Sequence, residues 1–287
     1  MPKYYLFLLL IFPMVSGAQT LKLKNRLPSF PGGSQFAASI SDSNLSLAAR
    51  EKLIHREIRK GNVPQFYRTL VPVTDSVNIN NKTSTIRYYV LPDYLAIGSD
   101  ADYFYCPMTP VLAQKVARIL GCSLPTRKMS DQIYRAATVK MRPQPIPPSP
   151  AMTTVPVFQN HSQSVSEQRE KSIKDQPLGS LVAGNKKDVV ISGKMYKDGK
   201  LRVVIYGWHQ ESAKPIQPLY NGHTADWADY SHGIRLIQKK IWVNGRSTRL
   251  KKILKSGTLH PLLSDEGPIT HVKYPTKQLA VKQVILK

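Results

Sequence analysis

Two helices with clear terminal signals and a short connection constrain the fold more than any other feature of the chain. Thr109 is placed as the N-cap of the first helix, Pro110 lies in its first turn, and Gly121 marks its end. The second helix follows Thr126 and runs over residues 127–137. Each helix has one apolar side, so we expect the pair to form a helical hairpin packed against strands.

Strand-like segments lie on both sides of this helical pair. They are rich in β-branched and aromatic residues, and short turn signals separate several of them. An earlier helix is expected from Asp42 or Asn44 to about Lys60, which Gly61 ends. The pattern predicts an α+β fold in which N-terminal helices pack on a mostly antiparallel sheet. The expected strands are residues 66–77, 85–95, 188–192, 200–206, 233–239, 240–244 and 248–253.

The first residues of the chain indicate export. Lys3 precedes an apolar run that ends in Ser16-Gly17-Ala18, which is typical of a signal peptide cleaved after residue 18. An uncleaved anchor is the rival interpretation, but the run is short for a spanning helix of about 20 residues. The location predicted is therefore secreted or periplasmic, with no transmembrane segment after cleavage.

The predicted domain organisation leaves one large folded unit. Residues 19–40 are basic and then rich in Gly, Pro and Ser, which indicates a linker. Residues 41–270 form a single α+β domain, and the prolines of 141–157 give it an extended internal loop that is not helical. Residues 271–287 are a basic tail.

The charge balance indicates a polyanionic partner. The chain holds 41 Lys and Arg against 18 Asp and Glu, a formal net charge of +23. Such a field attracts acidic polymers and anionic surfaces. Because an exported protein rarely meets nucleic acid inside the cell, nucleic acid is an unlikely partner, and cell-wall material or another anionic polymer is expected instead.

Only two cysteines are present, Cys106 and Cys122, and they either pair or remain free. Two cysteines do not make a disulfide framework, so stability must come from a packed core.

Residues 201–237 concentrate the side chains that carry chemistry. They include His209, His223 and His232, with Asp226 and Asp229 close by in sequence. We predict His209, His223, Asp229 and His232 as catalytic residues. Substrate-binding roles are predicted for Lys187, Asp188, Trp208, Gln217, Tyr230, Ser231 and Arg235.

Three mechanisms remain open for this segment. In the first, the three histidines with Asp226 or Asp229 bind zinc, which activates water. In the second, a metal-free site uses one histidine poised by Asp229, with Tyr230 or Ser231 as its partner, while Lys187 and Arg235 hold an anionic substrate. In the third, the histidines belong to the core or to a binding groove, and no reaction occurs.

Several short sequence segments resemble a family of secreted bacterial proteins to which no activity is assigned. They lie within residues 45–269 and include Tyr206-Gly207-Trp208-His209, Ile216-Gln217-Pro218-Leu219 and Asp229-Tyr230-Ser231-His232-Gly233. The resemblance implies export and one continuous domain. A looser likeness, to NlpC/P60-type cell-wall peptidases, implies Cys106 as a nucleophile, although Cys106 precedes its helix instead of starting it. Pro107 departs from that pattern.

The predicted function is a secreted hydrolase that acts on cell-envelope, peptidoglycan-like or other anionic polymer through a His/Asp site. The first alternative is a non-catalytic protein that binds polyanions or carbohydrate. The second is a polysaccharide lyase.

Overall fold

The structure is a computed structural model that describes residues 19–276. The predicted signal peptide and residues 277–287 of the predicted tail lie outside this range. The chain is 29% helical and 25% strand with mostly antiparallel sheets, which confirms the predicted α+β class. No helix within residues 19–276 is long and apolar enough to cross a bilayer.

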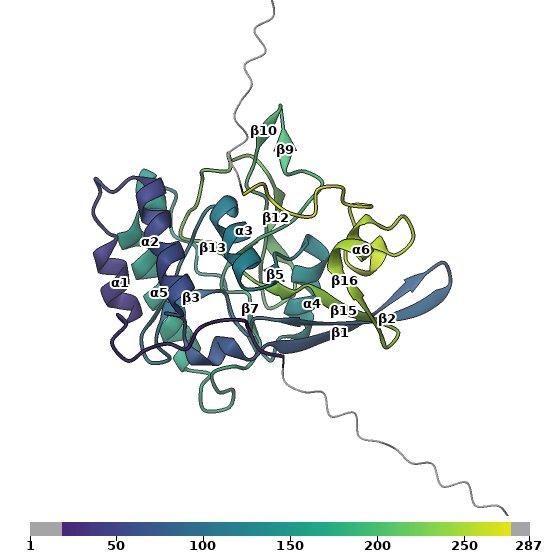
Figure 1. Ribbon diagram of the computed structural model, residues 1–287, viewed down its shortest axis with the longest axis horizontal. Helices are drawn as coiled ribbons and strands as arrows, with labels where there is room; N and C mark the ends of the chain where they lie inside the picture. Colours follow the sequence, from purple (N-terminus) through teal and green to yellow (C-terminus); the bar gives the residue numbers. More distant parts are fainter. Residues whose placement is uncertain (1–18, 277–287) are drawn as a thin grey trace, which may run out of the picture.

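Helices α1, α2 and α5 are grouped on one side of the molecule in Figure 1, while α6 lies on the opposite side. Short 3-10 segments are labelled η. The α-helices are α1 (Gly33–Ser39), α2 (Leu47–Lys60), α3 (Pro110–Ile119), α4 (Arg127–Ala136), α5 (Val155–Glu170) and α6 (Leu250–Lys255), and the 3-10 segments are η1 (Gln65–Arg68), η2 (Pro150–Thr153) and η3 (His260–Leu262).

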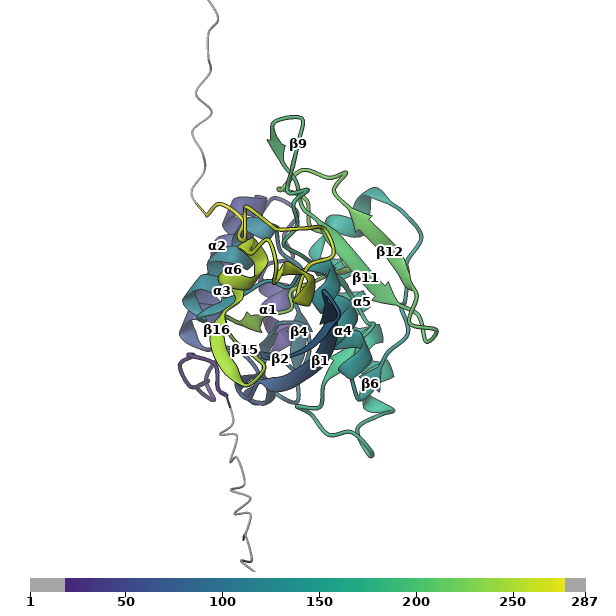
Figure 2. The same ribbon diagram turned by 90° about the vertical axis from the view of Figure 1, so that its right-hand side faces the viewer.

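Two main sheets lie on different sides of the molecule, as Figure 2 shows for β12 and β15. The six-stranded sheet has the order β16-β15-β2-β14-β5, with β1 also paired to β2. Its strands are β1 (Val71–Ile79), β2 (Lys82–Val90), β5 (Cys122–Ser123), β14 (Ile237–Gln238), β15 (Lys240–Val243) and β16 (Arg246–Arg249).

The four-stranded sheet carries most of the predicted site residues and has the order β12-β11-β8-β13. Its strands are antiparallel except for the parallel pair β8 and β13. They are β8 (Lys187–Val189), β11 (Ile205–His209), β12 (Pro215–Tyr220) and β13 (His232–Gly233). Three two-stranded sheets complete the fold: β3 (Ala96–Gly98) with β4 (Tyr103–Tyr105), β6 (Val139–Lys140) with β7 (Val182–Ala183), and β9 (Tyr196–Lys197) with β10 (Lys200–Leu201).

The turn between the strands predicted over residues 66–77 and 85–95 forms a hairpin that joins β1 to β2. Asn80 and Asn81 have φ values of 49° and 62°, which asparagine tolerates better than most residues. The two strands pair in register from Val71 opposite Val90 to Ile79 opposite Lys82. Local turn chemistry therefore fixes this long ribbon.

The predicted N-cap of α3 is confirmed, and Thr126 caps α4 in the same way. The Thr109 hydroxyl accepts from the Leu112 amide at 3.3 Å, and the Thr126 hydroxyl accepts from the Met129 amide at 3.2 Å. The expected helical hairpin is not the main packing, because α3 packs on α2 and β5 while α4 packs on β1 and β11. The connection contains β5, whose pairing with β14 holds the two helices on separate surfaces.

Residues 19–40 are not a linker. They contain α1, and Phe36 and Ala37 are buried in the core. Upstream, the Leu21 amide donates to the Arg68 carbonyl at 2.9 Å. The Gly, Pro and Ser content misled the prediction because apolar residues set between them are enough to anchor the segment.

The Pro-rich region is also more ordered than predicted. It contains η2 and the start of α5, where Pro156 lies in the first turn. Proline is tolerated there because the amide it lacks has no helical partner.

Several element boundaries also differ from the sequence prediction; residues 66–68, for example, belong to η1, and β1 starts only at Val71. Helix α2 starts later than expected, with Ser46 as its N-cap rather than Asp42 or Asn44. The strand expected over 248–253 ends at Arg249, where α6 begins.

One hydrophobic core cluster extends from Leu21 to Tyr274. Tyr274 belongs to the predicted tail, yet it is fully buried. Its hydroxyl donates to the Val190 carbonyl at 2.9 Å and accepts from the Val204 amide at 3.0 Å. The start of the tail is therefore part of the folded core.

Candidate functional site

A distortion of β11 shapes the candidate site. The register of β11 with β12 shifts between Ile205 and Gly207. Gly207 and Trp208 have positive φ values of 104° and 57°. A bulky residue at positive φ is an outlier that the surrounding structure must hold in place, and such bulges occur often beside functional sites. Trp208 is nonetheless buried, and its indole Nε1 has no hydrogen-bond partner.

Six side chains gather next to this bulge, and we name them the Asp229 cluster. Lys187 and His232 are paired in register on parallel strands, so their side chains share one face of the sheet. Lys187 Nζ lies 4.9 Å from the centre of the Trp208 ring. The cluster consists of Lys187, Trp208, His223, Trp227, Asp229 and His232.

His223 and Trp227 form the outer part of the cluster. Their rings are stacked with centroids 4.5 Å apart and an interplanar angle of 11°. The Trp227 Nε1 donates to Asp229 Oδ2 at 3.2 Å. Because Lys187, His223 and Trp227 are half-buried while Asp229 and His232 are buried, the cluster meets solvent through these outer residues.

Asp229 and His232 form the inner pair. His232 Nε2 lies 3.4 Å from Asp229 Oδ2, and both ring nitrogens of His232 lack a hydrogen-bond partner. The other carboxylate oxygen accepts from the Ser231 amide at 2.8 Å and the Ser231 hydroxyl at 2.5 Å. Ser231 is thus bound to the carboxylate rather than to an imidazole, so it is not activated as a nucleophile.

The pKa values of this pair diverge. Burial lowers the pKa of His232, against the opposing effect of Asp229. Burial raises the pKa of Asp229, but His232, the Ser231 hydrogen bonds and Lys187 outweigh it and lower that pKa to about 2. At neutral pH the site therefore combines an ionised carboxylate with a neutral imidazole, the protonation states that a base and its orienting group require.

His209 lies elsewhere. Its Nε2 is 2.8 Å from Asp131 Oδ1, and the Tyr206 hydroxyl donates to the same oxygen at 2.9 Å. The Tyr134 ring stacks on the imidazole at 4.5 Å. Sequence reasoning missed Asp131 because it lies on α4, far from the histidine-rich segment.

The predicted zinc site is not formed. His209 pairs with Asp131, whereas His223 and His232 belong to the Asp229 cluster. Within residues 19–276, no three His, Cys, Asp or Glu side chains are arranged to hold a metal ion. The prediction treated closeness in sequence as closeness in space, and the strand directions separate these side chains.

Asp188 and Arg235 belong to a buried polar network around Tyr94 rather than to the Asp229 cluster. Asp188 follows Lys187 in β8 and so faces the opposite side of the sheet, where its Oδ2 accepts from the Tyr94 hydroxyl at 3.1 Å. Burial raises the pKa of Asp188, and Arg235 opposes the shift. Arg235 is fully buried over the Tyr94 ring, with its guanidinium carbon 4.1 Å from the ring centre.

Two other predicted binding residues also have local roles. The Tyr230 hydroxyl accepts from the Ile146 amide at 2.8 Å and so ties the Pro-rich region to the site. Gln217 is half-buried on β12, where its Nε2 donates to the Pro218 carbonyl at 3.0 Å. The Tyr230 ring also packs edge-on against Trp208 of the Asp229 cluster, with ring centroids 6.2 Å apart.

Lys186 and His161 form a buried pair that sequence reasoning missed. Lys186 Nζ lies 2.8 Å from His161 Nδ1 and donates to the Tyr230 carbonyl at 2.7 Å. His161 Nε2 lies 3.1 Å from the Gln144 carbonyl, so that nitrogen carries the proton and Nδ1 accepts from the lysine. Burial lowers the pKa of His161 to about 2 and that of Lys186 to about 7. In the sequence, Lys186 is marked only by its position directly before Lys187, the first residue of β8.

The cysteines are free and buried, which argues against Cys106 as a nucleophile. Burial raises the pKa of both thiols, that of Cys122 to about 12. Because thiolates are the reactive form, we expect neither cysteine to react with a maleimide in the native protein and both to react after denaturation. Mass spectrometry of the labelled chain measures this, and rapid native labelling of Cys106 would restore the nucleophile hypothesis.

Comparisons with known proteins give no relative: no family model, no curated protein and no solved structure matches the chain. The geometry of the site is therefore the basis for a functional proposal.

Proposed function

We propose that the protein is a metal-free hydrolase in which His232 acts as general base and Asp229 orients it. The observation that carries this proposal is the buried His232 imidazole, whose ring nitrogens have no hydrogen-bond partner although an ionised carboxylate lies 3.4 Å away. Buried polar groups are almost always satisfied, and exceptions call for a catalytic role or a bound molecule. A water molecule or substrate group at His232 satisfies this requirement.

The expected reaction is hydrolysis of an amide or ester. His232 takes a proton from water, the hydroxide adds to the carbonyl carbon, and the protonated imidazole returns the proton to the leaving group. The half-buried Lys187 ammonium and the unpartnered Trp208 N–H supply a cation and a donor for developing negative charge. The predicted export and the net charge of +23 favour an anionic cell-envelope polymer as substrate.

Purified cell-wall fragments and acidic polysaccharides, incubated in ¹⁸O-labelled water, test the reaction. Hydrolysis places ¹⁸O in one product. The predicted alternative, a lyase, breaks the chain without oxygen from water and leaves a double bond. No turnover of any fragment would favour the binding protein of the first alternative.

Asp229→Asn should lower kcat/KM by roughly 100-fold or more, because the neutral amide removes the negative charge that lies 3.4 Å from the imidazole and would stabilise its protonated form. Asp226→Asn is the matched control, since Asp226 is exposed and its carboxylate contacts Thr224 rather than the imidazole. His232→Gln should cause at least the same loss. Circular dichroism must show native secondary structure in each variant, and equal activity of both Asp variants would refute the assignment.

The pH profile gives a second readout. The neutral imidazole is the active form, so activity should be constant above the pKa of His232 and fall as the pH drops through it. Because burial lowers that pKa below the ordinary 6.5, the acidic limb should lie below pH 6.5. A limb above pH 7 in kcat/KM would contradict His232 as the base.

A further inference from the structure

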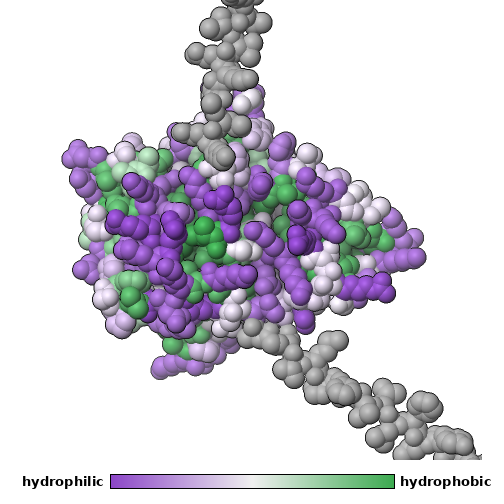
Figure 3. Space-filling view, viewed as in Figure 1, coloured by the Kyte–Doolittle hydropathy of each residue, from purple (hydrophilic) through white to green (hydrophobic). Residues whose placement is uncertain are grey.

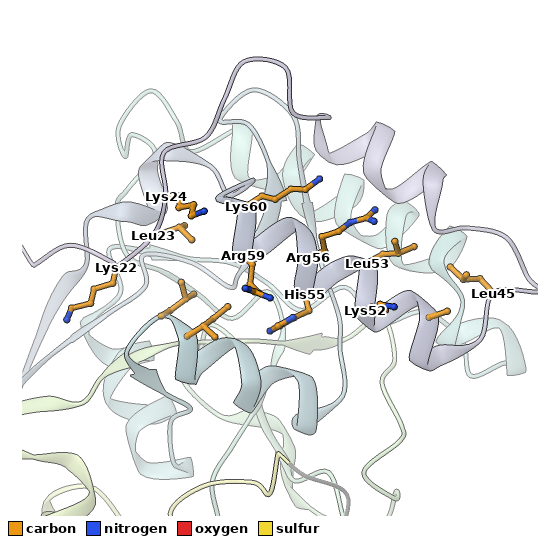
Figure 4. Close-up of a pocket in the computed structure, with 13 residues that line it drawn as sticks. Lys22, Leu23, Lys24, Leu45, Lys52, Leu53, His55, Arg56, Arg59 and Lys60 are labelled. Atoms are coloured by element: carbon orange, nitrogen blue, oxygen red, sulfur yellow. The ribbon is translucent and has the colours of Figure 1, made fainter.

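A basic groove lies between the N-terminal segment, α2 and α3, away from the Asp229 cluster. It encloses about 910 Å³. Figure 4 shows Lys22, Leu23 and Lys24 on the N-terminal segment and Lys52 to Lys60 along α2. No residue of the Asp229 cluster lines it. The groove therefore needs an explanation of its own.

The floor of the groove is apolar. Four of its residues are half-buried and pack against the core, while Leu120 is fully buried. In Figure 3 a hydrophobic area surrounded by hydrophilic residues lies near the middle of this face, where Figure 1 places α2 and α3. An apolar strip of this kind makes few favourable contacts with a fully charged polymer. The floor consists of Leu23, Leu45, Leu53, Ile119 and Leu120.

The rim of the groove is positively charged, and no Asp or Glu side chain lines the groove. Its exposed cations are Lys22, Lys24, Lys52, Arg56, Arg59 and Lys60.

Two of these cations are partly neutralised by one buried carboxylate. Lys60 Nζ lies 3.1 Å and Arg56 Nε 3.7 Å from Glu57 Oε1. The salt bridges within residues 19–276 include none to Lys22, Lys24, Lys52 or Arg59. An apolar floor beneath unpaired cations matches a ligand with phosphate groups next to hydrocarbon.

The position of the groove in the chain also suits a membrane. The apolar run of the sequence ends at Val15, and Lys22 lines the groove seven residues later. Seven residues reach at most about 25 Å. Export through the predicted signal peptide would therefore bring Lys22 and Lys24 close to a bilayer.

We propose that this basic groove docks the protein on anionic phospholipid membranes, with lipid phosphates on the rim cations and acyl or glycerol carbons against the leucine floor. Basic and apolar contacts together give stronger membrane attachment than either alone. This docking is independent of the proposed hydrolase activity.

Co-sedimentation with vesicles tests the docking. The purified protein should bind vesicles of phosphatidylcholine mixed with phosphatidylglycerol and should bind pure phosphatidylcholine vesicles much more weakly. The triple variant Lys24→Glu, Lys52→Glu, Arg59→Glu should lower the partition coefficient roughly tenfold or more. Equal binding to both vesicle types would overturn the proposal.

A matched triple variant separates the groove from net charge. Arg246→Glu, Lys251→Glu and Lys252→Glu change the formal charge by the same amount on exposed positions of β16 and α6. This variant should bind mixed vesicles within about threefold of the wild type. A loss equal to that of the groove variant would show a general charge effect and overturn the assignment.

A third variant tests the apolar floor. Leu53→Gln leaves every charge in place and should weaken binding to mixed vesicles while leaving binding to heparin unchanged. Unchanged vesicle binding would remove the floor from the proposal. Heparin binding that depends on the rim, without vesicle binding by the wild type, would identify an acidic polymer as the occupant instead.

Discussion

Lys186→Met should abolish a large rise in stability between pH 7 and pH 10.5. In the folded protein, burial lowers the pKa of Lys186 to about 7, against an ordinary value of 10.5, although Asp229 and Asp93 partly oppose the shift. Between these values the unfolded chain binds the proton and the folded chain does not. Stability of the wild type therefore rises with pH through this window, and below it the full cost of burying the charged lysine remains and no longer changes with pH.

The expected size of this effect is large. At about 1.4 kcal/mol for each pKa unit, the difference corresponds to roughly 5 kcal/mol as an upper limit. Urea unfolding from pH 6 to pH 10 should show the free energy of unfolding of the wild type rising relative to the variant by several kcal/mol. Methionine has no charge to desolvate, so it contributes no change of the unfolding free energy with pH.

Other groups titrate in the same window, so the difference between matched proteins is the quantity to measure. Lys200→Met is the control, because Lys200 is exposed on β10. Its free energy of unfolding should follow that of the wild type at every pH. A wild-type to Lys186→Met difference that stays constant with pH would mean that Lys186 keeps its ordinary pKa in the folded protein.

Arg235→Ala should destabilise the fold by about 3–5 kcal/mol, because it breaks a buried polar network. The guanidinium donates to the Leu91 carbonyl at 3.1 Å and to the Val182 carbonyl at 2.7 Å. It also stacks on the Tyr94 ring and lies near Asp188. Removing it leaves two buried carbonyls and a buried carboxyl without their cation.

Denaturant unfolding of two further variants makes this result specific. Arg235→Lys retains the charge but not the planar fork, so we expect an intermediate loss of about 1–3 kcal/mol. Arg246→Ala, at an exposed position, should change stability by less than about 0.5 kcal/mol. Native stability in Arg235→Ala, combined with weaker substrate binding, would instead support the substrate-binding role predicted from the sequence.

Part of the candidate site could be predicted from the sequence. The segment that contains Asp229, Ser231 and His232 was identified because acid, base and hydroxyl groups are dense there. The Ser231 hydrogen bonds to Asp229 span only two residues, so local geometry decides them. His209 was misassigned because its partner Asp131 is 78 residues away.

The sequence by itself determined the elements whose signals are local. Thr109 and Thr126 cap their helices through bonds to residues three positions ahead, and Asn80-Asn81 closes its hairpin. The net charge also follows from the amino-acid sequence alone. Such features depend on a few adjacent residues, so a local pattern is enough to predict them.

Only the tertiary structure decided which side chains meet. The register of β8 with β13 places His232 beside Lys187, and α5 brings His161 to Lys186. The basic groove joins residues from the N-terminal segment, α2 and α3. The physical reason is that long-range pairing depends on burial and strand register summed over the whole core, which no local pattern of residues encodes.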